Sequence, residues 1–154
     1  MIVIGVGNAA RGDDAAGLRA AAALRERVPA GVVVREHEGE TLALLDGWEG
    51  AAAVILVDAV RSGATPGMLH RLDASSTPLP ETLTSSSSTH ALSLAETIEL
   101  ARALGRLPAT VIVHGVEGRR YDAGAGLSPE VAAAIEPLVA AVERDLEAVS
   151  RPRS

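Results

Sequence analysis

The sequence predicts an α/β fold in which helices cover both faces of a largely parallel sheet. Short β-branched runs alternate with longer helical patterns along the chain, which is typical of βαβ units. Four of these runs are almost continuously apolar, as expected of strands buried on both faces; they span residues 2–6, 32–36, 53–58 and 110–114. The length of 154 residues fits one domain over residues 1–150, with a frayed tail at 151–154.

Helical patterns fill the intervals between these strands. We expect a first helix from Asp13 or Asp14 and a shorter one after Thr41. Small and branched side chains form the buried stripe of the first helix: Gly17, Ala21, Leu24 and Val28.

Two longer helices are expected in the second half of the chain. One should run over residues 90–104 and end at Gly105. The other should begin with Ser128 as its cap and Pro129 at its first position, with a kink at Pro137.

Two segments interrupt the alternation. Residues 68–72 follow residue 58 too closely for a helical crossover, so they predict an antiparallel strand. Residues 74–89 are rich in Ser, Thr and Pro and carry no periodicity. So long a loop in a compact domain is usually functional or disordered.

Composition excludes several classes of function. The net charge is −6 and the only adjacent pair of bases is Arg119 and Arg120, so nucleic acid is a poor partner. With no cysteine, the chain has no disulfide, thiolate metal site or cysteine nucleophile. The amino terminus does not resemble a signal peptide, and the longest apolar run, residues 51–57, is too short to span a membrane. We expect a cytoplasmic protein.

Polar side chains follow several of the predicted strands. Asp13 and Asp14 lie in the stretch GVGNAARGDDAAG, between the first strand and its helix, and Asp58 ends an apolar strand. His90 begins the helix after the Ser-rich loop. Other polar residues at strand ends are His37, Glu38 and His114. Because the carboxyl ends of parallel strands meet at one edge of a sheet, we expect these residues to converge there.

Two carboxylates and an imidazole from different loops could hold a divalent transition metal with open positions. Each residue also has a structural interpretation. One of Asp13 and Asp14 should cap the helix, and we assign this role to Asp13; a lone histidine is more often structural than a ligand. We interpret His37 and His114 as structural. We expect His70 to point away from its strand without a role.

Two other classes of function are less compatible with the sequence. The glycines of the first loop resemble a nucleotide-binding turn, but their spacing does not match G-x-G-x-x-G, and acids at the helix start would repel a pyrophosphate. A non-catalytic metal- or nucleotide-binding module remains the alternative. No G-x-S-x-G elbow indicates a serine nucleophile.

Several motifs together resemble the hydrogenase maturation proteases, which trim the large subunit of nickel–iron hydrogenases. They are GVGNAARGDDAAG, VILVDAV, SSTHALSLAE, VIVHGVEG and LSPEV, and they occur in order over nearly the whole chain. Peptidyl-tRNA hydrolases have a similar opening, but their proline-glycine and their later histidine–asparagine pair are absent here.

The resemblance implies a phosphorylase/hydrolase-like, three-layer α/β/α fold with a five-stranded mixed sheet. It implies a metal site formed by Asp14, Asp58 and His90, which reads nickel already installed in the hydrogenase large-subunit precursor. Another divalent metal, such as zinc or cadmium, could take the same place. The implied enzyme removes the carboxy-terminal extension of that precursor and is monomeric when free.

One stretch departs from the family pattern. After the second strand the family usually has an Asp-Gly-Gly-Thr-like sequence, whereas this chain has EHEGET, so that Glu38 replaces the acid and Glu40 the second glycine. Glu38 and Asp13 are the candidate proton acceptors, and Gly7, Asn8 and Gly39 shape the substrate loops. We assign the loop of residues 74–89 to substrate recognition. Two roles for the metal remain open, in catalysis or only in docking the precursor.

Overall fold

The computed structural model describes residues 1–38, 40–80, 84–85 and 93–151. Its central feature is a mixed sheet in the strand order β2–β1–β3–β6–β4, formed by Val33–His37, Ile2–Val6, Ala53–Arg61, Thr110–Glu117 and Leu69–Asp73. The first four strands in this order are parallel, and β4 is antiparallel to β6. The predicted five-stranded mixed sheet and its antiparallel strand are therefore confirmed.

A sixth, two-residue strand extends the sheet at one point. β5, Thr84–Ser85, pairs antiparallel with Val60 and Arg61 of β3. Pairing between β1 and β3 ends at Val57, so β5 occupies the edge of β3 that β1 leaves uncovered. β3 thus runs past the predicted end at Asp58.

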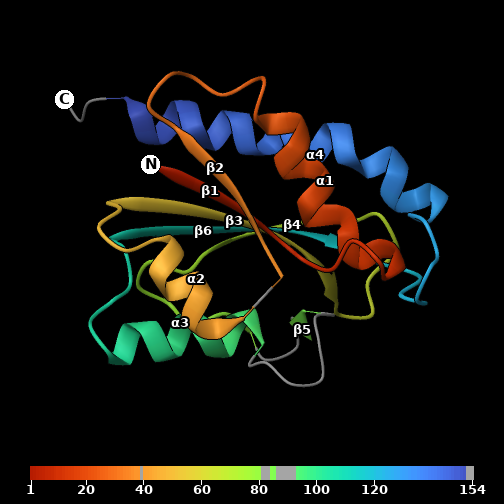
Figure 1. The fold of residues 1–154 in the computed structure, drawn as a ribbon, viewed down its shortest axis with the longest axis horizontal. Coiled ribbons are helices and arrows are strands. Elements are labelled where there is room, and N and C mark those ends of the chain that lie inside the picture. Colours follow the sequence, from red (N-terminus) through yellow and green to blue (C-terminus); the bar gives the residue numbers. More distant parts are fainter. Residues whose placement is uncertain (39, 81–83, 86–92, 152–154) are drawn as a thin grey trace.

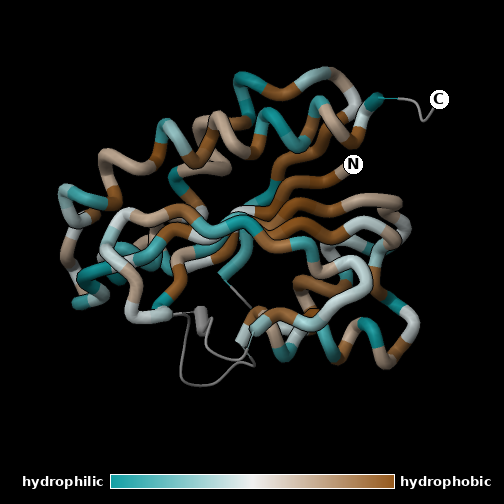
Figure 2. Tube along the Cα trace, turned by 180° about the vertical axis from the view of Figure 1, so that it is seen from behind, coloured by the Kyte–Doolittle hydropathy of each residue, from teal (hydrophilic) through white to brown (hydrophobic). Residues whose placement is uncertain are grey.

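Helices cover both faces of the sheet (Figure 1). α1, Ala16–Leu24, and α4, Pro129–Ser150, lie on one face; α2, Thr41–Gly47, and α3, Leu94–Ala103, lie on the other. Alternate side chains of each strand enter two separate cores, with Val3 and Ile55 on the α1–α4 side and Ile4 and Leu56 on the α2–α3 side. Figure 2 shows the resulting apolar strands at the centre of the molecule.

The α1 helix lies unusually close to the sheet because glycines face each other. A Cβ on Gly17 would be 2.3 Å from the carbonyl oxygen of Val57 and 2.4 Å from that of Val6. A Cβ on Gly5 would be 2.3 Å from the carbonyl oxygen of Gly17. This contact fixes the start of α1, and with it the acidic turn before the helix, against the carboxyl ends of β1 and β3.

The helix starts differ from the predictions. Asp13 and Asp14 lie in a 3₁₀ turn, Gly12–Ala15, and α1 itself begins at Ala16 and ends before Val28. α3 begins at Leu94, not near residue 90, because Ser93 and Glu96 form a capping box there.

Other boundaries agree with the sequence patterns. α2 follows Thr41, Gly105 has a φ of 69° just after α3, and Pro129 takes the first position of α4. Ser128 occupies the N-cap position, but its hydroxyl makes no capping bond and donates instead to Asp13. None of the helices in the described chain is both long and apolar enough to cross a membrane.

Candidate functional site

The loop after β1 is held tightly against its neighbours. The Gly7 amide donates to the His37 carbonyl at 3.0 Å, and the Asn8 amide donates to the Asp14 carbonyl at 3.2 Å. The Asn8 side chain accepts from the Ala10 amide at 2.9 Å, which closes the turn. A Cβ on Gly7 would lie 1.9 Å from the Asp14 carbonyl oxygen, so only glycine fits. The loop therefore holds Asp14 in one place.

Asp14 and Asp58 form a buried acidic pair. Asp14 is 1% exposed and Asp58 is fully buried in β3. Burial raises the pKa of Asp58 well above its ordinary value, the nearby Asp14 charge raises it further, and the Ala59 amide offsets this in part. Within the described residues neither oxygen of Asp58 accepts a hydrogen bond of good geometry. A bound cation would supply the charge that this site lacks.

Asp13 points away from that pair and binds the loop before α4. Its carboxylate accepts from the amides of Arg119, Arg120 and Ser128 at 2.8, 2.9 and 2.7 Å, and from the Ser128 hydroxyl at 2.8 Å. Burial alone would raise the pKa of Asp13, but these hydrogen bonds outweigh it and lower the pKa below its ordinary value. The prediction that Asp13 caps the first helix is wrong, because the loop offers it four donors.

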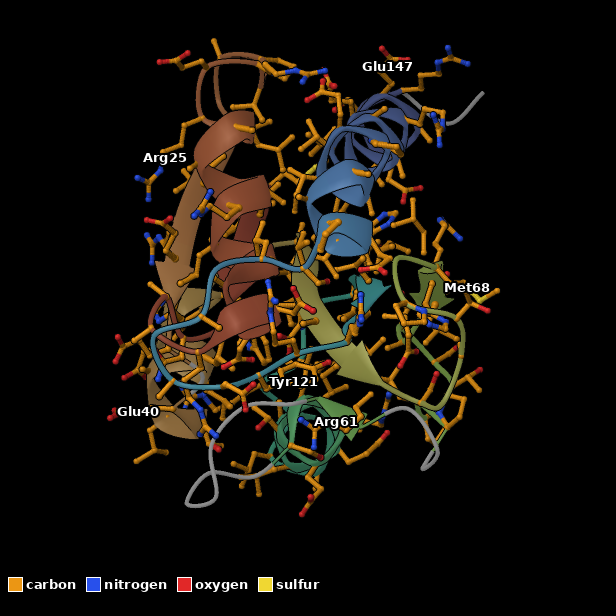
Figure 3. All side chains as sticks on the ribbon, turned by 90° about the vertical axis from the view of Figure 1, so that its right-hand side faces the viewer. Arg25, Glu40, Arg61, Met68, Tyr121 and Glu147 are labelled. Carbon is orange, nitrogen blue, oxygen red and sulfur yellow. The ribbon has the colours of Figure 1, made fainter. Side chains whose placement is uncertain are left out.

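The loop of residues 118–128 forms a wall next to the acidic turn. Backbone hydrogen bonds join it to the first loop, including Asp13 N to Arg120 O at 2.7 Å and Gly124 N to Ala10 O at 2.7 Å. The Tyr121 hydroxyl donates to the Val60 carbonyl, and the Arg61 guanidinium lies 4.1 Å from the centre of the Tyr121 ring (Figure 3). This wall was not identified from the sequence. The sequence feature that marks it is the single tyrosine of the chain, which directly follows two arginines.

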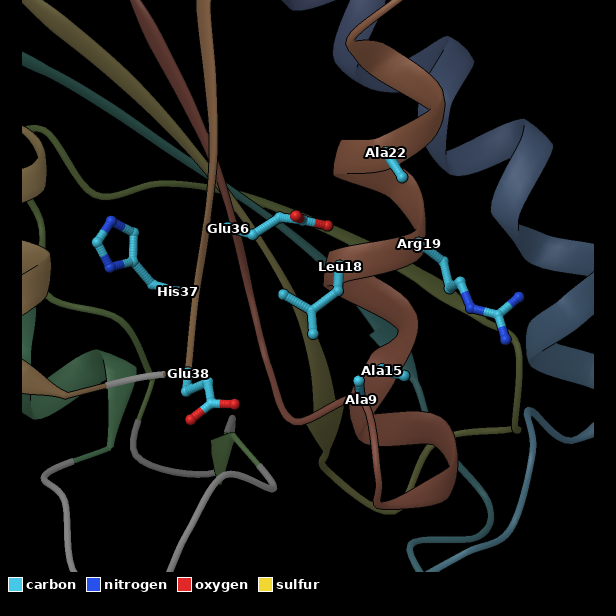
Figure 4. A pocket seen from close by; sticks show the side chains of 8 residues that line it. All are labelled: Ala9, Ala15, Leu18, Arg19, Ala22, Glu36, His37 and Glu38. Carbon is cyan, nitrogen blue, oxygen red and sulfur yellow. The ribbon is translucent and has the colours of Figure 1, made fainter.

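Glu38 lies in a groove of about 390 Å³ between β2 and α1. Figure 4 shows the residues that line it: Ala9, Ala15, Leu18, Arg19, Ala22, Glu36, His37 and Glu38. Glu38 is exposed at the end of β2, so it is accessible to a substrate. Gly39, predicted to belong to the same substrate loop, lies outside the described residues.

His114 and His70 each belong to a separate, structural cluster. His114 is buried, its Nε2 lies 2.5 Å from Asp145 of α4, and Arg71 of β4 binds the same carboxylate at 2.8 Å. Burial lowers the pKa of His114, although its hydrogen bond to Asp145 opposes this. The structural interpretation of His114 is thereby supported.

The expectation that His70 has no role is wrong. Its Nε2 lies 3.1 Å from the buried carboxylate of Glu117, which also accepts from the amide and the hydroxyl of Ser62 at 2.9 and 2.5 Å. Pairing of β4 with β6 brings His70 beside Glu117, a contact that strand alternation alone does not reveal. His37, also interpreted as structural, is half-buried against Gly47, and burial followed by the Arg35 charge lowers its pKa.

Two members of the predicted metal site are thus brought together, and the third is not described. His90 lies outside the described residues, as do residues 81–83 and 86–89 of the Ser-rich segment. In the part of the chain that the structure describes, no three His, Asp or Glu side chains gather closely enough to hold a metal. The buried carboxylate oxygens of Asp14 and Asp58 are of the kind that divalent cations bind.

Comparisons with known sequences find related proteins. The family model for the hydrogenase maturation proteases matches residues 39–145. The chain is 31% identical to a hydrogenase 2 maturation protease of Escherichia coli, over 98% of this chain and 96% of that protein. It is 30% identical to a hydrogenase expression/formation protein, HupD, of Rhodobacter capsulatus, over 96% of this chain and 71% of that protein.

Solved structures give the same result. The hydrogenase maturating endopeptidase HybD of E. coli superposes with a TM-score of 0.82 at 29% identity, covering 97% of this chain and 93% of that one. A nickel–iron hydrogenase maturation protease of Thermococcus kodakarensis superposes with a TM-score of 0.76 at 25% identity, covering 94% and 97%. The fold, the motifs and the likeness over nearly the full length lead to one conclusion: the chain belongs to the hydrogenase maturation protease family.

Proposed function

We propose that this protein removes the carboxy-terminal extension of a nickel-loaded hydrogenase large-subunit precursor and recognises the bound nickel through Asp14, Asp58 and His90. The observation that carries the proposal is the buried pair of Asp14 and Asp58: the Asp14 charge helps to raise the pKa of Asp58, and neither Asp58 oxygen accepts a hydrogen bond of good geometry within the described chain. Such a pair is costly to keep ionised unless a cation neutralises it.

The nickel is part of the substrate in this proposal. The two aspartates stand at the carboxyl edge of the parallel strands, where open α/β sheets bind their ligands. A precursor that has received its metal would gain carboxylate contacts that a metal-free precursor cannot make. Metal recognition would therefore let the protease distinguish completed from incomplete large subunits.

Glu38 is the proton acceptor in the proposed cleavage. It removes a proton from a water molecule as the water oxygen attacks the scissile carbonyl, and the leaving amine takes up a proton as the C–N bond breaks. Glu38 is exposed and lines the groove beside β2, whereas all four hydrogen bonds to Asp13 direct that carboxylate into the protein. This difference favours Glu38 over Asp13.

The test is cleavage of the nickel-loaded precursor from the same organism, followed by intact mass. We expect Asp14→Ala and His90→Ala to weaken precursor binding, and Glu38→Gln to slow cleavage about 100-fold or more with binding unchanged. Glu40→Gln is the matched control, because Glu40 is an exposed glutamate two residues away.

The outcomes separate the parts of the proposal. Loss of a discrete carboxy-terminal peptide only when nickel is present supports both the reaction and the recognition of the metal. Cleavage by Glu38→Gln at the wild-type rate would remove Glu38 from the mechanism. A nickel-loaded precursor left intact by the wild-type protein would instead support a non-catalytic binding module.

A further inference from the structure

The outer edge of β2 has backbone groups that are not used by the sheet. β2 is the first strand in the order, and within the described residues no strand pairs with its outer side. The Val33 amide bonds to Met1 and the His37 carbonyl bonds to Gly7, so these residues turn their backbone groups toward β1 and its following loop. Because alternate residues of a strand face opposite sides, the amides and carbonyls of Val34 and Glu36 point outward.

The β2–α1 groove, defined above by the residues that line it, lies beside this edge. Ala9, Ala15 and Ala22 are among its lining side chains, and such small groups leave room for another chain to approach. Figure 4 shows Glu36 directed toward Leu18 of α1, whereas His37 points to the opposite side of the strand. A strand added to β2 would place every second side chain in the groove.

The groove is continuous with the proposed active site. Ala15 directly follows Asp14 and Glu38 is the proposed proton acceptor, and both line the groove. Its charged lining groups are Glu36 and Glu38 against Arg19, so the lining carries net negative charge. This charge favours an occupant whose side chains are basic or neutral.

We propose that the carboxy-terminal segment of the precursor binds in extended form as an added strand on the outer edge of β2. The proposal rests on the proposed function and adds how that site holds its polypeptide substrate. Val34 and Glu36 each offer one amide donor and one carbonyl acceptor to the added strand. Main-chain pairing gives affinity with little dependence on sequence, while the groove selects alternate side chains.

The first test compares Glu36→Pro with Glu36→Ala. Both variants lose the 3.1 Å ion pair between Glu36 and Arg25, but only proline removes the outward amide and obstructs an added strand. An edge strand tolerates proline where its amide faces solvent. We expect the KM for cleavage of the nickel-loaded precursor to be about five- to tenfold higher for Glu36→Pro than for Glu36→Ala, at a similar kcat.

A second pair of variants tests the groove without touching the strand. Ala22→Trp fills the groove from the exposed side of α1, and Ala133→Trp is its control on the exposed side of α4, a helix that lines no part of the groove. We expect Ala22→Trp alone to raise the KM, by at least about fivefold. If Glu36→Pro does not fold, this second pair of variants tests whether the substrate occupies the groove.

Each outcome bears on one statement. If Glu36→Pro and Ala22→Trp each had the same KM as its control, the proposal that the substrate binds at β2 would be overturned. The proposed reaction would be unaffected by that result. Failure of the wild-type protein to cleave the precursor would refute the proposed function, and the strand addition with it.

Discussion

Asp13 shows how one carboxylate can join two parts of the chain. It lies in the acidic turn next to Asp14, yet its four hydrogen bonds all come from residues 119–128. Neighbouring acids thus have different tasks: Asp13 holds the wall of the site in place, and Asp14 faces Asp58. A change at Asp13 should act on the site through the position of the loop rather than through chemistry.

We expect Asp13→Ala to lower the free energy of unfolding by about 3 kcal/mol, because two arginine amides and the Ser128 amide and hydroxyl lose their buried acceptor. Denaturant unfolding measures this. Asp122→Ala, an exposed aspartate in the same loop, is the control and should change stability by less than about 0.5 kcal/mol. Equal effects of the two substitutions would contradict the anchoring role.

The raised pKa of Asp58 makes a prediction about pH. The folded state holds the Asp58 proton more tightly than the unfolded chain does, so this residue contributes stability at low pH and loses it as the pH rises above about 4. Asp58→Asn cannot titrate there. Its stability relative to the wild type should therefore improve with rising pH, by about 1.4 kcal/mol for each unit by which the Asp58 pKa is raised.

Denaturant unfolding of the wild type and of Asp58→Asn, from acid to neutral pH, tests the sign of this change in relative stability. Asp13, Glu117 and Asp145 have lowered pKa values and gain stability as the pH rises, but they are present in both proteins and cancel in the difference. A difference that does not change with pH would show that Asp58 titrates as it does in the unfolded chain.

At the scale of elements, the closeness of α1 to the sheet determines where the acidic turn lies. Gly17 contacts the carbonyls of both β1 and β3, so the helix axis cannot move outward without lifting the 3₁₀ turn away from Asp58. The helix gives up intrinsic stability at this glycine, since alanine is the better helix former by about 1 kcal/mol. The close approach explains why glycine is needed.

Gly17→Ala should therefore lower the free energy of unfolding by about 1–3 kcal/mol despite the better helix propensity of alanine, because the new Cβ overlaps two backbone oxygens. Thermal or denaturant unfolding checks the sign. Gly126→Ala is the control, since a Cβ there would meet no atom within 4 Å. If Gly17→Ala were stabilising, α1 would have to sit farther from the sheet than described.

For the whole molecule, the parallel sheet brings distant segments to one edge. Asp14 follows β1, Glu38 follows β2, and Asp58 stands near the end of β3. The Asp145 carboxylate binds Arg71 of β4 and His114 of β6, and so links α4 to the two strands at the far end of the sheet from β2. The site therefore depends on the sheet as a unit rather than on any one loop.

We expect the free protein to be monomeric. The exposed large apolar side chains in the described part of the chain are Val33 of β2, Leu42 of α2, Leu69 of β4, Met68 just before β4 and Leu104 just after α3. They are thus spread over several elements, and the net charge is −6. Light scattering should give a mass near 15.7 kDa. If the protein were instead a dimer, and if Glu36→Pro dissociated it, then a second copy rather than a substrate would pair with β2.

The sequence by itself determined the α/β class, the mixed sheet and the positions of Asp14 and Asp58 near strand ends, because burial periodicity and the lengths of the connections between strands can be read along the chain. It did not determine what a carboxylate contacts. Asp13 looked like a helix cap and His70 like a bystander, but loop packing and β4–β6 pairing gave them partners 106 to 115 and 47 residues away. Such partners depend on how separate elements pack, and only the tertiary structure decides that.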